Sequence, residues 1–209
     1  MKMGSDTQRS LFRPFDRISE FRALGVGLSA MLLCGALNCL CHVRFDGAVD
    51  VHLSPEPVSA VCLLAEGFIG WLVFAALLFM SGKIFSSSSI RFIDVLGNLA
   101  LSRWPLIFVS LAALVIPHQE VTRYLMGKYV PELPHATLSA PGMAQFIAFA
   151  LLTIIILTST VWMIILMYRG FSLACNLKGT KGMLVFGITL LVAEVISKYL
   201  ISVLAGSWE

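Results

Sequence analysis

Five long apolar stretches constrain the fold of this chain more than any other feature. A bilayer core about 30 Å thick requires about 20 helical residues at about 1.5 Å each. Five stretches meet that length, and none shows the alternation that barrel strands need. They run approximately Leu24–Val43, Val58–Met80, Val95–Ile116, Met143–Met167 and Met183–Ala205. The sequence therefore predicts an all-α polytopic membrane protein, a bundle of five transmembrane helices.

Composition excludes the main soluble alternatives. Of the 209 residues, 58% are apolar and 13% are charged, whereas soluble domains carry about 25% charge. A soluble chain of this length would leave too much apolar surface exposed. The net charge of +3, without a basic groove, also argues against nucleic-acid binding. We expect the lipid bilayer to be the principal partner.

The basic residues predict the orientation, because Lys and Arg concentrate in cytoplasmic loops. Ten lie on the side of the N-terminal arm: Lys2, Arg9, Arg13, Arg17, Arg22, Lys83, Arg91, Arg169, Lys178 and Lys181. Three lie in the loops of the other side: Arg44, Arg123 and Lys128. We expect a basic cytoplasmic arm, residues 1–23, a single transmembrane domain, residues 24–206, and an external C-terminus.

Four ionisable residues fall within the spans, where they are costly and mark candidate sites. Arg103 lies in the third span, while Glu66, Glu194 and Lys198 fall, with Asn38, in the outer half of the membrane. One hypothesis is a polar cluster in which Lys198 bridges Glu194 and Glu66, and Asn38 adds a hydrogen bond. The alternative is that Lys198 snorkels to the outer surface and each carboxylate is satisfied locally. In a cluster, the single opposite charge favours a structural clamp over an ion relay.

A polar stripe precedes the third span. Arg91, Asp94, Asn98 and Ser102 recur at steps of three and four residues, which predicts one face of an amphipathic helix. We expect this helix at the cytoplasmic interface, before the chain enters the membrane at Pro105.

Arg103 is expected near the cytoplasmic end of its span, where it either reaches the headgroups or pairs with Asp94. The functional alternative is binding of anionic lipid or a partner together with other basic residues of that face. The candidate residues for this second site are Asp94, Arg103, Arg169, Lys178 and Lys181.

The longest loop, residues 117–142, is expected outside the membrane. Residues 120–130 suit one short interfacial helix with Tyr124, Leu125 and Met126 toward lipid. Three prolines then exclude regular structure from the rest of the loop.

No enzyme, cofactor or metal site is expected. The sequence contains no HExxH, GxSxG or GxxxxGK[ST] motif and no paired intramembrane aspartates. The spacing of the four histidines matches no metal-binding pattern, and we expect solvated side chains at the outer face: His42, His52, His118 and His135. The five cysteines are odd in number and lie mostly in apolar runs, which favours packing over disulfides.

Two stretches carry a family resemblance. FIDVLGNLALSRWPLI, residues 92–107, and VWMIILMYRG, residues 161–170, are similar to the third and fourth spans of the Yip family of Ypt/Rab-GTPase-interacting membrane proteins, in its prokaryotic branch. The resemblance covers roughly residues 60–205 and implies a five-span, non-enzymatic membrane protein. Eukaryotic relatives act in vesicle traffic with small GTPases. We do not expect GTPase binding here, because the cytoplasmic arm is short.

We therefore expect a membrane scaffold or membrane-organising protein in a prokaryotic plasma membrane. Small residues such as Gly67, Gly70 and Ala193 permit close helix contact, so a homo-oligomer or other membrane proteins are expected partners. The alternative is a small transporter or channel subunit that uses the intramembrane Glu and Lys residues. A dry, satisfied polar cluster favours the scaffold, and a water path to Glu66 or Glu194 favours transport.

Overall fold

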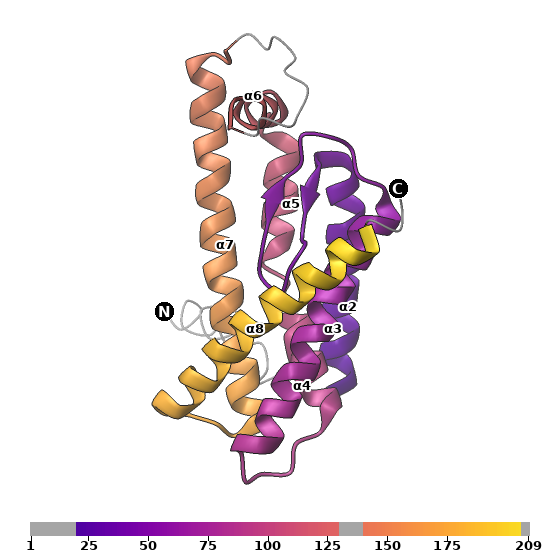
Figure 1. Cartoon of the computed structure of the whole chain (residues 1–209), viewed down its shortest axis with the longest axis vertical. Coiled ribbons are helices and arrows are strands. Elements are labelled where there is room, and N and C mark those ends of the chain that lie inside the picture. The colour runs from indigo at the N-terminus through magenta and orange to yellow at the C-terminus, as the bar shows by residue number, and fades with distance from the viewer. Residues whose placement is uncertain (1–19, 130–139, 206–209) are drawn as a thin grey trace, which may run out of the picture.

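The computed structural model describes residues 20–129 and 140–205 of the chain. Over these residues it forms helices and one short antiparallel hairpin (Figure 1). In chain order the elements are α2 (Glu20–Cys41), β1 (Val43–Arg44), β2 (His52–Leu53), α3 (Ala60–Phe85), α4 (Phe92–Ser102), α5 (Leu106–Val115), α6 (Gln119–Tyr129), α7 (Met143–Cys175) and α8 (Gly179–Ala205).

The five predicted spans are confirmed. Five helical segments are long and apolar enough to cross a membrane, with α4 and α5 together making the third. The prediction ends α7 too early, since this helix continues to Cys175 and stops where Asn176 takes a left-handed conformation with φ of 50°. A left-handed residue is a common helix terminator. Ser59 caps α3 by accepting a hydrogen bond from the Cys62 amide at 3.2 Å.

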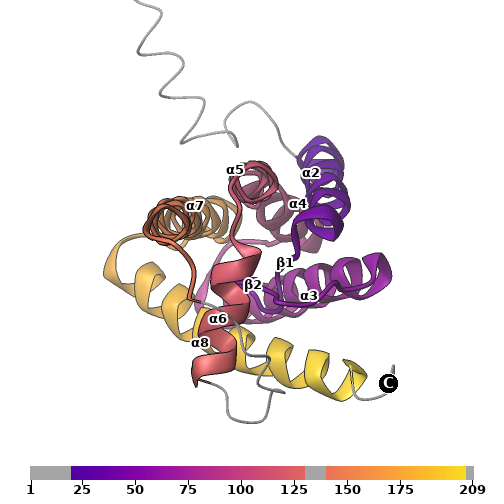
Figure 2. The ribbon, with the colours of Figure 1, turned by 90° about the horizontal axis from the view of Figure 1, so that it is seen from above.

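The third span is broken in its middle, and its first half is a core helix. The turn between α4 and α5 ends at Pro105, which precedes the first residue of α5, a position suited to a residue that cannot donate a backbone hydrogen bond. Figure 2 shows α4 and α5 between α2 and α7. The predicted interfacial position of α4 is therefore wrong. Its polar stripe serves helix packing, because Asn98 donates to the Gly170 carbonyl of α7 at 3.1 Å and the Ser102 side chain is fully buried.

The segment between α2 and α3 turns back into the bundle. The chain reverses at His42, whose φ is 54°, and β1 pairs with β2 in the register Val43↔Leu53 and Arg44↔His52. Figure 1 shows this hairpin running between α5 and α8. The sequence interpretation counted this segment among the loops of the outer side; the structure shows that it folds into the bundle and buries Phe45 and Ala48.

Three contacts measure how deep the hairpin tip lies. Gly47 packs on Gly70 of α3, ten residues beyond Ala60 and therefore about 15 Å along that helix. The Ala48 carbonyl accepts a hydrogen bond from Arg103. Arg103 lies twelve residues, or about 18 Å, before the end of α5. The Val49 amide donates a hydrogen bond to Glu194. Glu194 lies eleven residues, or about 16 Å, before the end of α8. The tip thus reaches the middle of the bundle. Irregular backbone is tolerated at that depth where protein buries it.

Helices α7 and α8 form an open V in Figure 1, close together at their junction and apart at the other end. Phe171 of α7 and Phe74 of α3 pack on Phe186 of α8 near the closed end, with ring centroids 5.9 and 5.7 Å away. Helix α6 lies at the open end, and its bounds are close to those of the short helix predicted over residues 120–130. The ring centroids of Tyr124 of α6 and Phe146 of α7 are 6.1 Å apart.

Candidate functional site

Charged residues from three helical spans converge on the hairpin and form what we call the tip site. Each lies on, or reaches toward, the segment that turns back into the bundle. Its members are Arg44, Asp46, Asp50, His52, Glu66, Arg103, Glu194 and Lys198.

The Arg44–Glu66 ion pair joins the hairpin to α3. The guanidinium donates to both carboxylate oxygens, with Nε 3.3 Å from Oε2 and Nη2 on Oε1. The Glu66 side chain is 1% exposed, so the bidentate partner is needed to hold its charge. The hydrogen bond to Glu66 raises the pKa of Arg44, outweighing the opposing effect of burial.

Arg103 occupies the centre of the molecule. It is 3% exposed and donates to the Gly67 carbonyl at 3.2 Å and the Ala48 carbonyl at 2.8 Å. Its Nε has no hydrogen-bond partner among the described residues, and it lines a cavity of about 20 Å³, which is room for about one water molecule. The prediction that Arg103 lies near the cytoplasmic end is wrong, because α4 is core and places the α4–α5 turn at mid-bundle.

Glu194 and Lys198 hold the hairpin from α8. Glu194 Oε2 accepts from the Val49 amide at 3.1 Å, and Lys198 Nζ lies 3.6 Å from Glu194 Oε1 and 2.5 Å from Asp50 Oδ2. A Cβ at residue 47 would overlap the Glu194 carboxylate, so a side chain there would require that carboxylate to move.

The structure divides the predicted polar cluster. It brings Glu194 and Lys198 together, as neighbours four residues apart on one helix face. Glu66 instead pairs with Arg44, and buried Asn38 accepts from Ser110 Oγ of α5 at 2.7 Å. The predicted bridge from Lys198 to Glu66 is therefore replaced by two separate contacts, because the hairpin tip lies between α3 and α8.

The remaining hairpin charges pair with one another. His52 Nδ1 and Asp46 Oδ1 are 3.2 Å apart. Burial opposes ionisation of Asp46, but the hydrogen bond and charge of His52, with Lys198, bring its pKa below the usual value. Sequence reasoning missed Arg44, Asp46, Asp50 and His52 as site residues. The available signal was an alternation of apolar and charged residues over 43–46, which is typical of a strand.

The expectation of solvated histidines fails for His118. It is 2% exposed, its Nε2 lies 3.0 Å from the Cys41 carbonyl oxygen, and burial lowers its pKa. The chain turns inward directly after α5, which places this imidazole beneath the end of α2. His135 lies outside the described residues.

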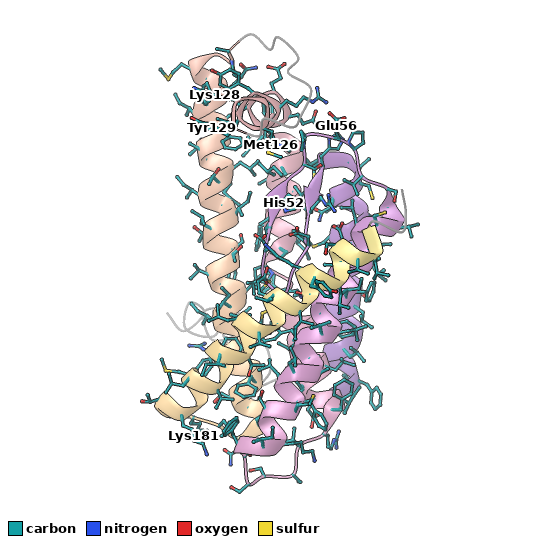
Figure 3. The ribbon with its side chains drawn as sticks, in the orientation of Figure 1. His52, Glu56, Met126, Lys128, Tyr129 and Lys181 are labelled. Carbon is teal, nitrogen blue, oxygen red and sulfur yellow. The ribbon has the colours of Figure 1, made fainter. Side chains whose placement is uncertain are left out.

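The second predicted site loses Arg103 and keeps its other members at one end of the molecule. Asp94 pairs with Arg91 at 3.4 Å, and Lys181 donates to the Phe85 carbonyl at 2.9 Å. Arg169 and Lys178 are exposed near the α7–α8 junction. Figure 3 shows Lys181 at the end opposite Lys128 and Tyr129 of α6.

Five spans with a broken third helix and an inward-folded hairpin define a polytopic integral membrane protein. The chain belongs to the Yip1 domain family, whose family model matches residues 9–197. That match includes the whole hairpin and every member of the tip site except Lys198. No curated protein and no solved structure matches the chain.

Proposed function

We propose that this protein is a non-enzymatic membrane scaffold with a membrane-organising role of the trafficking type. One observation carries the proposal: each charged residue of the tip site that lies within the spans has a partner in the protein. Glu66 is paired with Arg44, Glu194 with Lys198 and the Val49 amide, and Arg103 with two backbone carbonyls. Two buried atoms of these residues, Arg103 Nε and Glu194 Oε1, have no hydrogen-bond partner among the described residues. The contacts above nevertheless tie three spans to the hairpin and so stabilise one arrangement of helices.

The alternative function, a transporter or channel subunit, needs a path of water to these groups. The cavity beside Arg103 holds only about 20 Å³. A larger cavity of about 310 Å³ lies beside α6 and is lined by residues such as His118 and Glu120; none of the tip-site residues lines it. A groove of about 350 Å³ reaches His52 but none of the tip-site residues that lie within the spans, so this arrangement supports the scaffold over the transporter.

The outward faces of α7 and α8 supply the surface for lipids and membrane partners. Both carry a run of exposed large apolar side chains, including Ile154 and Leu157 on α7 and Leu191 and Val195 on α8. The small residues Gly70 and Ala193 are used inside the bundle, where Gly70 meets Gly47 and Ala193 is fully buried. Any oligomer would therefore form through the large apolar faces rather than through those two residues.

We place the protein in a prokaryotic plasma membrane with its N-terminus in the cytoplasm, on the strength of the basic-residue bias and the family resemblance. A fluorescent protein fused to the N-terminus should be bright and an alkaline phosphatase fused to the C-terminus active. The reverse pair of results would invert the orientation.

Reconstitution separates the two functions. The full chain in liposomes of phosphatidylethanolamine and phosphatidylglycerol, loaded with a pH-sensitive dye, should pass protons under an imposed potential no faster than Glu66→Gln liposomes. Proton or cation flux above that of the Glu66→Gln liposomes would show that the protein is a transporter or channel subunit.

A second measurement tests the scaffold directly. Polymer extraction of the tagged chain from its own membrane should retain a second copy or one membrane protein at fixed stoichiometry. Recovery of a monomer with lipid alone would contradict a scaffold.

A further inference from the structure

We infer that Asp46, Asp50 and His52 form a binding site for a first-row divalent cation of the Zn²⁺ type. One ligand atom of each residue lies within 4.8 Å of the other two. Donors about 2.1 Å from a tetrahedral zinc ion are about 3.4 Å apart. Side-chain rotations that shorten the donor–donor distances by up to about 1.4 Å would therefore bring all three donors to one ion.

The hairpin holds these donors in place before any ion binds. Asp46 follows β1, two residues after Arg44, and His52 belongs to β2 as the cross-strand partner of Arg44. The two side chains already meet at 3.2 Å. Asp50 Oδ1 accepts from the Val51 amide at 2.9 Å, and Oδ2 is the oxygen that Lys198 Nζ contacts. An oriented carboxylate of this kind loses little freedom on binding a metal.

The donor set selects the class of ion. One imidazole and two carboxylates suit Zn²⁺ and its neighbours, whereas Mg²⁺ and Ca²⁺ prefer oxygen donors alone. Three protein ligands leave a fourth position for water. His52 also lines a groove of about 350 Å³ between the hairpin, α6 and α7, so the imidazole is reached from outside the bundle.

The site already attracts a cation of the chain itself. Lys198 Nζ lies 2.5 Å from Asp50 Oδ2 and 3.6 Å from Glu194 Oε1. The lysine side chain is 47% exposed, so it is free to leave Asp50 and remain with Glu194. Arg44, the cross-strand partner of His52, is engaged by the buried Glu66 carboxylate. Lys198 is thus the competing cation, and a bound metal would displace it from Asp50.

Titration of the purified full chain with Zn²⁺ in detergent tests this site. Calorimetry should give one Zn²⁺ per chain, and Co²⁺ in its place should give the visible absorption of a four-coordinate ion. His52→Ala and Asp46→Asn should each weaken binding at least about tenfold, while Asp94→Asn, at the opposite end, should bind like the unaltered chain.

The variant Lys198→Met distinguishes loss of the metal site from loss of folding. Removing the competing ammonium should strengthen Zn²⁺ binding, which no loss of folding can imitate. The inference is overturned if the unaltered chain binds no Zn²⁺ at 100-fold excess, if His52→Ala binds it equally well, or if Lys198→Met binds it no more tightly. Millimolar Mg²⁺ should not displace the ion, and displacement would assign the site to hard cations instead.

Discussion

Two Arg–carboxylate pairs lie toward opposite ends of this molecule in opposite environments. At the hairpin, the Glu66 carboxylate is 1% exposed and takes two hydrogen bonds from Arg44. At the start of α4, Arg91 and Asp94 meet at 3.4 Å with side chains 57% and 31% exposed. An Arg–carboxylate pair therefore holds the hairpin inside the bundle in one place and lies on the exposed surface in the other. Coulomb attraction is screened at the surface and strong in the interior, where an unpaired charge is costly.

Loss of the buried pair should have the largest effect. Arg44→Met leaves the Glu66 carboxylate inside the bundle without its partner and should lower the free energy of unfolding by about 3 kcal/mol or more. Reversible unfolding in mixed detergent measures it. The double variant Arg44→Met with Glu66→Met should recover most of that loss. If the double variant is as unstable as the single one, the pair contributes more than charge compensation.

Packing of the tip against α3 should give the next largest effect. A Cβ at Gly70 would overlap the Gly47 carbonyl, whereas a Cβ at Gly67 meets no atom within 4 Å. Gly70→Ala should therefore destabilise by about 1–3 kcal/mol through overpacking. Gly67→Ala should be neutral or stabilise by up to about 1 kcal/mol, since alanine is the better helix former. Equal effects of the two variants on the melting temperature would show that the hairpin does not press on α3.

The buried histidine beside α2 should make stability depend on pH to a smaller degree. Burial lowers the pKa of His118 in the folded state, so the unfolded chain binds the proton first as pH falls. The stability it contributes is complete above about pH 6.5, the usual histidine pKa, and is lost as pH falls below it. Melting curves at pH 7.5 and 5.5 should differ less for His118→Gln than for the unaltered chain. An unchanged difference would assign the pH dependence to other groups.

The surface pair should have the smallest effect. Asp94→Asn removes its charge and should change the free energy of unfolding by no more than about 0.5 kcal/mol. Added salt should reduce even that difference. A loss comparable to that of Arg44→Met would show that the start of α4 is as tightly constrained as the hairpin.

Much of the fold could be predicted from the sequence, and less of the site. The number of spans follows from apolar length, and the short helix α6 from a polar segment bounded by prolines. Glu194 and Lys198 were predictable neighbours because four residues on one helix set their spacing. The partners of Glu66 and Asn38 were not, since Arg44 is 22 residues from Glu66 and Ser110 is 72 residues from Asn38.

The sequence by itself determined that the chain is a five-span membrane protein and which polar residues its spans contain. Transfer of an apolar segment into lipid depends on that segment alone, so its composition is sufficient to decide it. Only the tertiary structure decided that residues 42–59 fold inward and that Arg103 lies at mid-bundle. Both depend on contacts between distant segments, such as the Val49 amide with Glu194, 145 residues away. Backbone without helical hydrogen bonds is stable at that depth only because Arg103 and Glu194 provide partners for it.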